Sequence, residues 1–205
     1  MELSGNTLPN NLVAAILHSL DELMGTNGLN SVLNAAGLQE WIKQPPAPNE
    51  ERDVDFSQFS ALFRTLEDLY GQKGSQSLMR RVNTAVFDQV WSGHRAFEDI
   101  ESPETQELEA DSQIERGLTA LANALCETSD ILAKVDVGDS GRHFSIERCP
   151  YCWNADGDLP QCYAFQGLLE RAVLHFAPDS KVEIEEIACI GAGDSNCMFT
   201  IILQS

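Results

Sequence analysis

Residues 182–203 read VEIEEIACIGAGDSNCMFTIIL, and this stretch decides the fold. Residues 182–190 and 198–203 are rich in β-branched and other apolar side chains, as is typical of strands. The residues between them, Gly191-Ala-Gly-Asp-Ser-Asn196, have the composition of a turn. The stretch therefore predicts a β-hairpin.

A second hairpin is predicted earlier in the chain. Residues 131–137 and 143–147 have strand character, and Gly138-Asp-Ser-Gly141 reads as the turn between them. Residues 160–176 separate the two hairpins and have the pattern of a helix, with Pro160 suited to its first turn. The order strand, strand, helix, strand, strand predicts a four-stranded antiparallel sheet.

The part of the chain before residue 98 has helical periodicity. Apolar side chains recur at helical spacing in residues 8–23, 56–70 and 75–91, and a shorter helix fits residues 30–36. Asp55 is placed to cap the helix that begins at Phe56. Helix breakers separate these segments, namely Gly25, Gly28, Gln44-Pro-Pro-Ala-Pro48, Gly71 and Gly74.

Together these patterns predict an α+β fold in which N-terminal helices pack with a four-stranded antiparallel sheet. At 205 residues the chain can bury a full core, and we expect a single domain over residues 1–205. Within it, residues 1–97 form a helical portion and residues 98–111 an acidic surface connection. Residues 112–205 contain a further helix, over 114–128, and the two hairpins.

The charge balance argues against several classes of partner. Thirty-two acidic residues against 13 basic ones give a formal net charge of -19, which repels phosphate backbones and anionic membrane surfaces. The apolar run at residues 12–17 is too short to span a bilayer, and no basic residue precedes it as in a secretion signal. We therefore expect a cytoplasmic protein that binds neither nucleic acid nor membranes directly.

Five of the six cysteines gather in the last third of the chain, namely Cys149, Cys152, Cys162, Cys189 and Cys197. A chain of this size without an export signal does not depend on disulfides, so the clustering indicates metal or redox chemistry. Cys126 stands apart in a helical pattern. We interpret it as a buried structural thiol.

Cys189 and Cys197 are placed symmetrically about Gly193, so an ungapped hairpin would set them opposite each other. Cross-strand Cβ atoms lie roughly 4.5–5.5 Å apart, which allows two thiolates to share a metal ion or to form a disulfide. A reducing compartment favours the metal. Glu186 precedes Cys189 by three positions, and on a regular strand this odd offset puts the two side chains on opposite faces. If both bind one metal, a bulge or a strand end has to intervene.

Cys149-Pro-Tyr-Cys152 has the sequence of a glutaredoxin dithiol. In that dithiol a helix begins directly after the motif and lowers the pKa of the thiol, whereas Trp153-Asn-Ala-Asp-Gly-Asp158 reads here as a turn-rich loop. The sequence therefore favours a metal-binding or loop-shaping role for Cys149 and Cys152 over redox catalysis.

The pattern Glu186-x-x-Cys189-x-x-x-Gly193-Asp194-x-x-Cys197-x-Phe199-x-Ile201 resembles the C-terminal signature of 4-vinyl reductase domains. Cys149-Pro-Tyr-Cys152, followed by QCYAFQG at residues 161–167, is similar to the cysteine loop and helix of the same family. The resemblance implies a fold related to the small subunits of the transport protein particle, which are often dimeric. It also implies kinship with the sensor domains of phenol-responsive transcription activators.

By the same resemblance, a zinc ion is held by Cys162, Glu186, Cys189 and Cys197. Three thiolates and a carboxylate fill a tetrahedral zinc ion, so the site would be structural and would close one wall of a pocket. Cys149 and Cys152 could contact that pocket or supply a rival set of ligands. Three further side chains lie near enough in sequence to line it, namely His143, Trp153 and His175.

Three functions are compatible with these features. The first is a module that binds or senses a small apolar or aromatic molecule, such as a hydrocarbon or a tetrapyrrole, between the sheet and the N-terminal helices. The second is a dimeric scaffold that passes signals to a partner polypeptide. The third is an enzyme or accessory factor in tetrapyrrole vinyl reduction. It is disfavoured because the sequence has no nicotinamide or flavin motif and a saturated zinc ion has no Lewis-acid position.

Overall fold

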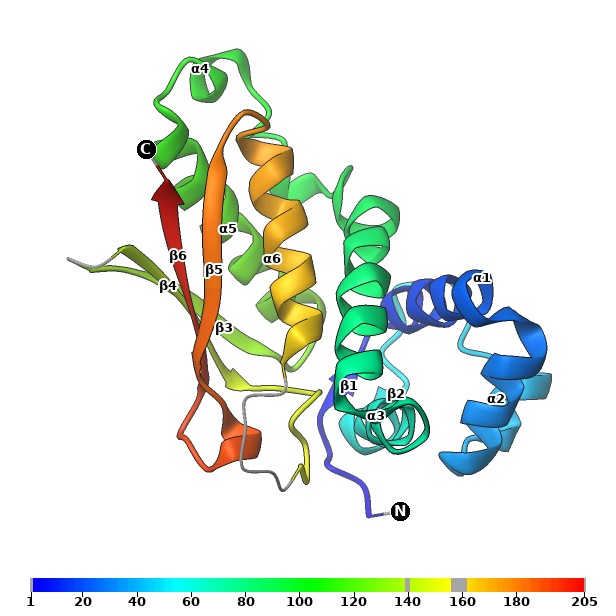
Figure 1. Ribbon diagram of the computed structural model, residues 1–205. Coiled ribbons are helices and arrows are strands. Elements are labelled where there is room, and N and C mark those ends of the chain that lie inside the picture. Colours follow the sequence, from blue (N-terminus) through cyan, green and yellow to red (C-terminus); the bar gives the residue numbers. More distant parts are fainter. Residues whose placement is uncertain (1, 139–140, 156–161, 205) are drawn as a thin grey trace.

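The computed structural model describes residues 2–138, 141–155 and 162–204, and its C-terminal half is built around a four-stranded antiparallel sheet (Figure 1). The strands are β3 (Leu132–Gly138), β4 (Gly141–Arg148), β5 (Lys181–Ala188) and β6 (Cys197–Gln204). Their order in the sheet is β3-β4-β6-β5, so the central β4–β6 pair joins the two hairpins. The α+β fold class predicted from the sequence is confirmed.

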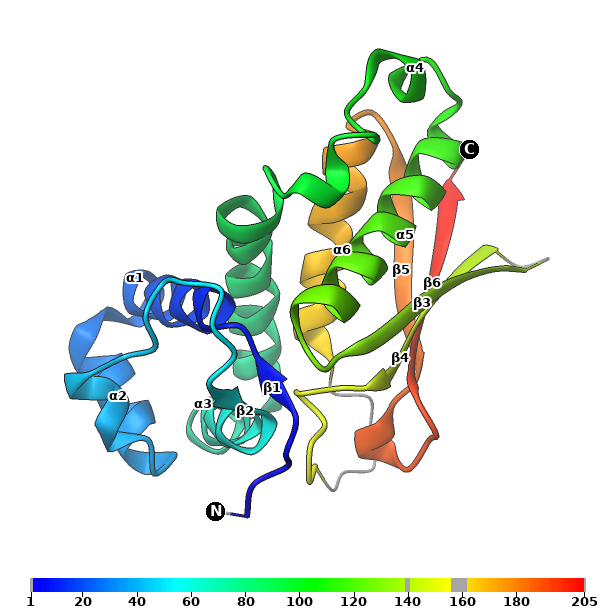
Figure 2. The same ribbon diagram turned by 180° about the vertical axis from the view of Figure 1, so that it is seen from behind.

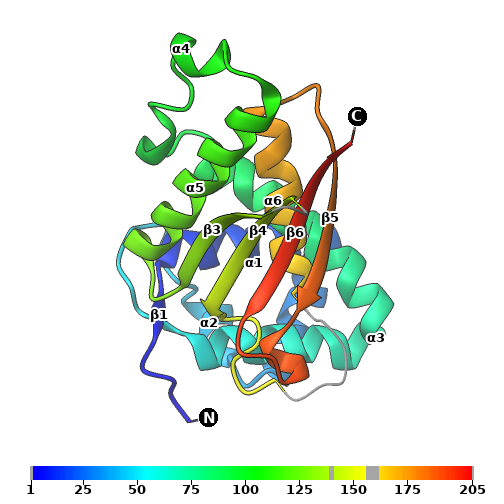
Figure 3. The same ribbon diagram turned by 90° about the vertical axis from the view of Figure 1, so that its left-hand side faces the viewer.

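Two helices cover one face of this sheet, namely α5 (Ala110–Thr128) and α6 (Tyr163–Phe176). In Figure 3 the strands lie in front of both helices. The apolar side chains of β4 and β6 that are most fully buried, Phe144, Ile146, Phe199 and Ile201, are at most 1% exposed and belong to the central core. The alternation along each strand thus gives the sheet one apolar face, and the helices remove that face from water.

The N-terminal helices lie on the other side of α6. They are α1 (Asn10–Ala35), α2 (Gln39–Lys43) and the long α3 (Phe56–Val86), which packs on α6 (Figure 2). Two short strands, β1 (Thr7–Leu8) and β2 (Val54–Asp55), pair with each other beside them. The remaining elements are a π-helical turn η1 (Phe87–Trp91), the 3₁₀ turns η2 (Arg95–Phe97) and η3 (Ile190–Ala192), and α4 (Pro103–Gln106).

Glycines break two of these helices where the sequence predicts. Gly25 in α1 has φ 75° and Gly71 in α3 has φ 69°, and each turns the chain sharply inside the helix. Left-handed backbone is inexpensive for glycine because it has no Cβ. The predicted breaks at Gly28 and Gly74 are wrong, because both residues have ordinary helical backbone.

Asp55 caps α3 as predicted. Its carboxylate accepts hydrogen bonds from the backbone N–H groups of Ser57, Ser4 and Gly5, and the side chain of Gln58 accepts one from the Asp55 N–H. Burial raises the pKa of Asp55, but the hydrogen bonds outweigh burial and lower it to about 2. One carboxylate therefore begins α3 and anchors the first residues of the chain.

The sequence predicts a surface connection over residues 98–111, but in the structure this acidic segment is partly helical and partly buried. It contains α4, and its Thr105 side chain is buried. At its end, Asp111 accepts two hydrogen bonds from Arg142 of β4, whose side chain is only 7% exposed. Glu115 lies 3.6 Å from the same guanidinium. The segment is thus tied to the sheet by a nearly buried cation.

Asp111→Asn is expected to lower the free energy of unfolding by about 1–2 kcal/mol at pH 7. A fully buried pair costs more when broken, but Asp111 is about half exposed. The hydrogen bonds from Arg142 lower the pKa of Asp111 below 3.8, so its stabilising effect is present at higher pH and is lost as pH falls through that lowered pKa. Urea unfolding of the wild type, of Asp111→Asn and of the exposed control Glu107→Gln tests this. Equal loss in both variants would refute the role of the pair.

No helix among the described residues is both long and apolar enough to cross a lipid bilayer.

Candidate functional site

Five buried cysteines meet at one end of the sheet. Cys149 and Cys152 follow β4, Cys162 lies at the start of α6, Cys189 follows β5, and Cys197 begins β6. Figure 1 shows the loop after β4 (yellow) and the turn before β6 (orange-red) at this same end. The structure thus brings together the five cysteines that the sequence singles out in the last third of the chain.

The sulfur atoms lie close together without being bonded. The Sγ atom of Cys152 is 3.0 Å from that of Cys162, 3.5 Å from that of Cys189 and 3.6 Å from that of Cys197. Cys162 Sγ is also 3.4 Å from the Sγ atoms of Cys149 and Cys197. All six cysteines are free thiols, because a disulfide would bring two sulfurs to about 2.05 Å.

A β-bulge brings Glu186 to the same side as Cys189. The pairing of β5 with β6 shifts by one residue between Glu186, opposite Phe199, and Ala188, opposite Met198. The extra residue at Ile187 reverses the alternation of side chains. On a regular strand Glu186 and Cys189 would point to opposite faces. The bulge is one of the two irregularities that the sequence required for both residues to bind one metal ion.

Two groups of side chains here could hold a metal ion. One is the predicted set, Cys162, Glu186, Cys189 and Cys197, and the other is the all-cysteine set Cys149, Cys152, Cys162 and Cys197. Within each group the ligand atoms all lie within 4.8 Å of one another. The sequence analysis named Cys149 and Cys152 as possible rival ligands, and the structure places both of them in the cluster.

Burial and neighbouring thiols shift the pKa values of the ionisable side chains in this cluster. Burial, and then the charge of Cys189, raises the pKa of Glu186 to about 9. Hydrogen bonds with neighbouring thiols raise the pKa of Cys162, while such bonds lower the pKa of Cys152. Metal binding would displace thiol protons, which is the usual behaviour of thiolate sites.

The loop that carries Cys149 and Cys152 is fastened to α3. The Tyr151 hydroxyl donates to the side-chain oxygen of Asn83 at 2.8 Å, and the Tyr151 ring packs edge-on against Phe59, Phe63 and Phe165. Arg64 of α3 also donates to the backbone oxygen of Asn154. Cys152 lies in a turn and not in the first turn of a helix, so the helical environment of a glutaredoxin thiol is absent at this residue.

Cys126 lies outside the cluster. Its Sγ accepts a hydrogen bond from the backbone N–H of Ala133 at 3.2 Å and lies 3.4 Å from the Ala133 carbonyl oxygen. The thiol is only partly buried, but it fits the structural role predicted for it, because it fastens α5 to the start of β3.

The three residues proposed to line a pocket lie in different surroundings. His143 on β4 is 3.3 Å from the hydroxyl of Thr200. His175 contacts the carboxylate of Glu101 at 3.0 Å and packs beside the Phe87 ring. Trp153 follows Cys152 and packs against the core. None of the three lines either of the cavities described next.

The larger of these cavities lies between α1, α2 and the proline-rich loop. Its volume is about 720 Å³, and its walls are largely apolar, with Leu17, Leu29, Leu33, Trp41, Ile42, Pro45 and Pro46 among the lining residues. Asp21 also lines it, and one carboxylate oxygen of Asp21 is buried without a hydrogen-bond partner among the described residues. The cavity therefore offers largely apolar walls and a buried hydrogen-bond acceptor, and further polar residues line it, namely Asn11, His18, Thr26, Asn30 and Gln89.

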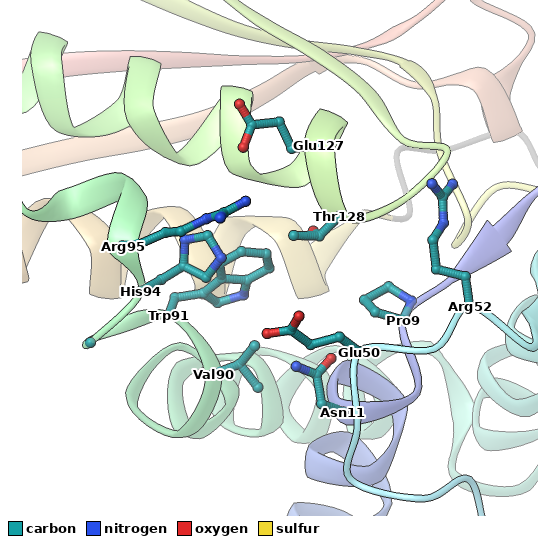
Figure 4. A pocket seen from close by; sticks show the side chains of 11 residues that line it. Pro9, Asn11, Glu50, Arg52, Val90, Trp91, His94, Arg95, Glu127 and Thr128 are labelled. Carbon is teal, nitrogen blue, oxygen red and sulfur yellow. The ribbon is translucent and has the colours of Figure 1, made fainter.

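A smaller cavity of about 490 Å³ lies where the start of α1 meets η1 and the end of α5. Figure 4 shows its charged side chains, Glu50, Arg52, Arg95 and Glu127, around the space beside Trp91 and His94. The Trp91 indole N–H is buried without a partner among the described residues. Val90 of η1 lines both cavities, and π-helical turns often mark functional sites.

The sequence patterns do not predict these cavities. The π-helical turn gave no usable signal, since residues 87–91 continue the apolar spacing of an ordinary helix.

Both the cysteine signature and the fold of this chain have counterparts among known proteins. The family model of the 4-vinyl reductase domain matches residues 142–203. No curated protein sequence matches the chain. Among solved structures, a substituted variant of Tt H-NOX has a TM-score of 0.60 and 14% identity, over 97% of this chain and 96% of its own.

Two further H-NOX structures have a similar fold at similarly low sequence identity. An H-NOX protein from S. oneidensis in the Fe(II)NO ligation state has a TM-score of 0.57 and 14% identity, over 93% of this chain and 98% of its own. The IWP-051-bound H-NOX from Shewanella woodyi in the Fe(II)CO ligation state has a TM-score of 0.56 and 12% identity, over 94% and 92%. At such identities the likeness concerns the fold alone.

The cysteine signature and the family match cover the same part of the chain, since Glu186, Cys189 and Cys197 all lie within the matched residues. Cys149, Cys152 and Cys162 lie there too. Residues 142–203 therefore match the 4-vinyl reductase domain family, in agreement with the resemblance carried by the signature.

Proposed function

We propose that this protein is a small-molecule-binding domain of the sensor type, stiffened by a structural zinc ion. The observation that carries the binding function is the apolar cavity between α1 and α2. Its volume of about 720 Å³ falls within the range of small-molecule sites, and largely apolar walls with a small number of polar groups are typical of them. The sequence analysis expected a ligand between the sheet and the N-terminal helices, whereas this cavity lies within the helical portion itself.

The ligand class follows from the lining of this cavity. The aliphatic and aromatic walls suit a hydrocarbon or aromatic skeleton, and the buried oxygen of Asp21 suits one hydrogen-bond donor on it. The H-NOX structures of similar fold are described in NO and CO ligation states, which supports a sensor role for this architecture. We assign to this chain an apolar or aromatic molecule that carries one hydroxyl or amino group.

Zinc is supported by the chemistry of the cysteine cluster. Thiolates are strong zinc ligands, and a tetrahedral set that consists only of protein ligands is structural because no position stays open for water. Such an ion would join α6 to the β5–β6 hairpin. Cys162 and Cys197 belong to both candidate ligand sets, so they are the residues that would hold it in either case.

Haem does not fit the described side chains around η1, α6 and the smaller cavity, although one of the H-NOX structures concerns haem distortion in that family. The space between η1 and α6 is filled by Phe87, Phe97 and Phe176, with the rings of Phe97 and Phe176 5.0 Å apart. His175 in this region already contacts Glu101. His94 lines the smaller cavity, but four charged side chains surround that space, and its Nδ1 accepts a hydrogen bond from the Ala96 N–H.

Binding of 1-naphthol, a neutral aromatic molecule with one hydroxyl group, tests the cavity. We expect saturable binding by calorimetry and at least a roughly tenfold loss in Ala14→Phe, which places a ring inside the cavity. Ala35→Phe is the matched control, because Ala35 lies exposed on the same helix. Equal affinities in the two variants would remove the cavity as the binding site.

The homodimer and the cytoplasmic location expected from the sequence stay predictions. So does the scaffold function, for which a dimer that binds no small molecule would be the supporting result.

A further inference from the structure

We infer that the zinc ion is held by four sulfur atoms, with Cys152 as a ligand and Glu186 outside the ligand set. This inference rests on the proposed zinc site and specifies its ligands. It concerns the loop Cys149-Pro-Tyr-Cys152, for which the signature quartet has no role.

The first argument is the position of the Cys152 sulfur. A tetrahedral zinc ion with Zn–S bonds of about 2.3 Å holds its sulfurs about 3.8 Å apart. The Sγ atom of Cys152 lies 3.0–3.6 Å from the Sγ atoms of Cys162, Cys189 and Cys197. These four sulfurs thus have nearly the spacing that one ion requires.

The second argument is that Cys152 is shared by the alternative sulfur sets. Cys152 lies close to Cys162 and Cys197, and either Cys149 or Cys189 can complete a set of four sulfurs. Each choice leaves one thiol beside the site, because a tetrahedral ion accepts four. The inference therefore depends on Cys152 and not on the choice between Cys149 and Cys189.

The third argument is that Glu186 already has another role. Its Oε2 accepts the backbone N–H of Cys162 at 3.0 Å, which holds the residue where α6 begins. Its Oε1 is buried without a partner among the described residues, and this atom is the rival for the fourth position. Net charge does not decide between the two, since four thiolates and three thiolates with a carboxylate carry the same charge.

The consequence is a link between the two halves of the protein. The loop that carries Cys152 is fastened to α3 through Tyr151 and Asn154. A zinc ion bound by Cys152 would join that loop to the β5–β6 hairpin and to α6. The N-terminal helices that form the cavity would then be connected to the metal through α3. If Glu186 were the ligand instead of Cys152, no residue of this loop would bind the ion.

X-ray absorption at the zinc edge of the wild-type protein tests the ligand set directly. We expect a shell of four sulfurs at about 2.3 Å with no oxygen at about 2.0–2.2 Å. Three sulfurs and one oxygen would overturn the inference while leaving the proposed zinc site intact. Absence of zinc from folded, reduced protein would instead overturn the proposed site itself.

Two substitutions give an independent result by chelator competition. Cys152→Ser is expected to weaken zinc binding by roughly 100-fold or more, whereas Glu186→Gln costs only about tenfold, as an outer-shell hydrogen bond does. The four-sulfur absorption signal should persist in Glu186→Gln. The opposite order, with zinc lost in Glu186→Gln and kept in Cys152→Ser, would contradict the inference.

Discussion

Protein purified in reducing buffer without a metal-affinity step is expected to carry about one zinc ion per chain, and Cys197→Ala is expected to lose it. Cys197 belongs to both candidate ligand sets and begins the central strand β6. Its Sγ also accepts the backbone N–H of Ile190 at 3.4 Å, so the turn before β6 is shaped around this sulfur. Elemental mass spectrometry measures the metal content of each protein.

The effect on stability should be large as well. Zinc that binds only the native state adds its binding free energy to folding, and structural thiolate sites in zinc-finger peptides bind with roughly 10–16 kcal/mol at pH 7. We therefore expect a strong chelator to lower the melting temperature of the wild type but not that of Cys197→Ala. Because metal binding releases protons from the thiols, zinc retention should weaken as pH falls.

Cys126→Ala is the matched control. Cys126 is a cysteine of the same chain whose Sγ bonds to the backbone of Ala133, away from the cluster, so its removal should leave the zinc content unchanged. If the folded, reduced wild type holds no metal, the zinc proposal fails. A disulfide or thiol role for Cys189 and Cys197 then becomes the better explanation.

Gly167→Ala is expected to destabilise the protein by about 3 kcal/mol, at the upper end of the usual cost of overpacking. Gly167 lies on α6 where this helix meets α3. A Cβ atom there would lie 2.4 Å from the backbone oxygen and 2.8 Å from the Cα of Arg80. A flexible side chain could move aside, but the backbone of α3 can yield only by separating the two helices.

Gly93→Ala is the matched control for this substitution, because a Cβ at Gly93 meets nothing within 4 Å. Urea unfolding followed by circular dichroism compares the two variants with the wild type. If both variants unfold at the wild-type midpoint, the close contact between α3 and α6 does not exist in solution. Gly167→Ala should also weaken zinc binding, since it displaces α6 and with it Cys162.

Much of this structure could be read from the sequence because it follows local rules. The alternation in residues 182–203, the capping residue Asp55 and the helix-breaking Gly25 and Gly71 each act over a few residues. The 4-vinyl reductase signature was equally local, since its spacing can be read without knowing any contact. The predicted breaks at Gly28 and Gly74 failed because a glycine with ordinary helical backbone costs a helix only about 1 kcal/mol, which packing readily offsets.

Tertiary structure alone decided three features of the candidate site. The bulge at Ile187 lets Glu186 and Cys189 face one site, and it arises from the pairing of β5 with β6. Cys152 enters the cluster because Tyr151 packs on α3, more than 60 residues earlier in the chain. The cavity forms where α1, α2 and the proline loop fail to fill the space between them.

The sequence by itself thus determined which elements form and which residue types can bind a metal. The positions of those side chains relative to one another depend on contacts between distant segments, and no local pattern encodes them. Hydrophobic burial draws α3, α6 and the sheet together without regard to direction. Strand register and close packing then fix which sulfur and which carboxylate meet.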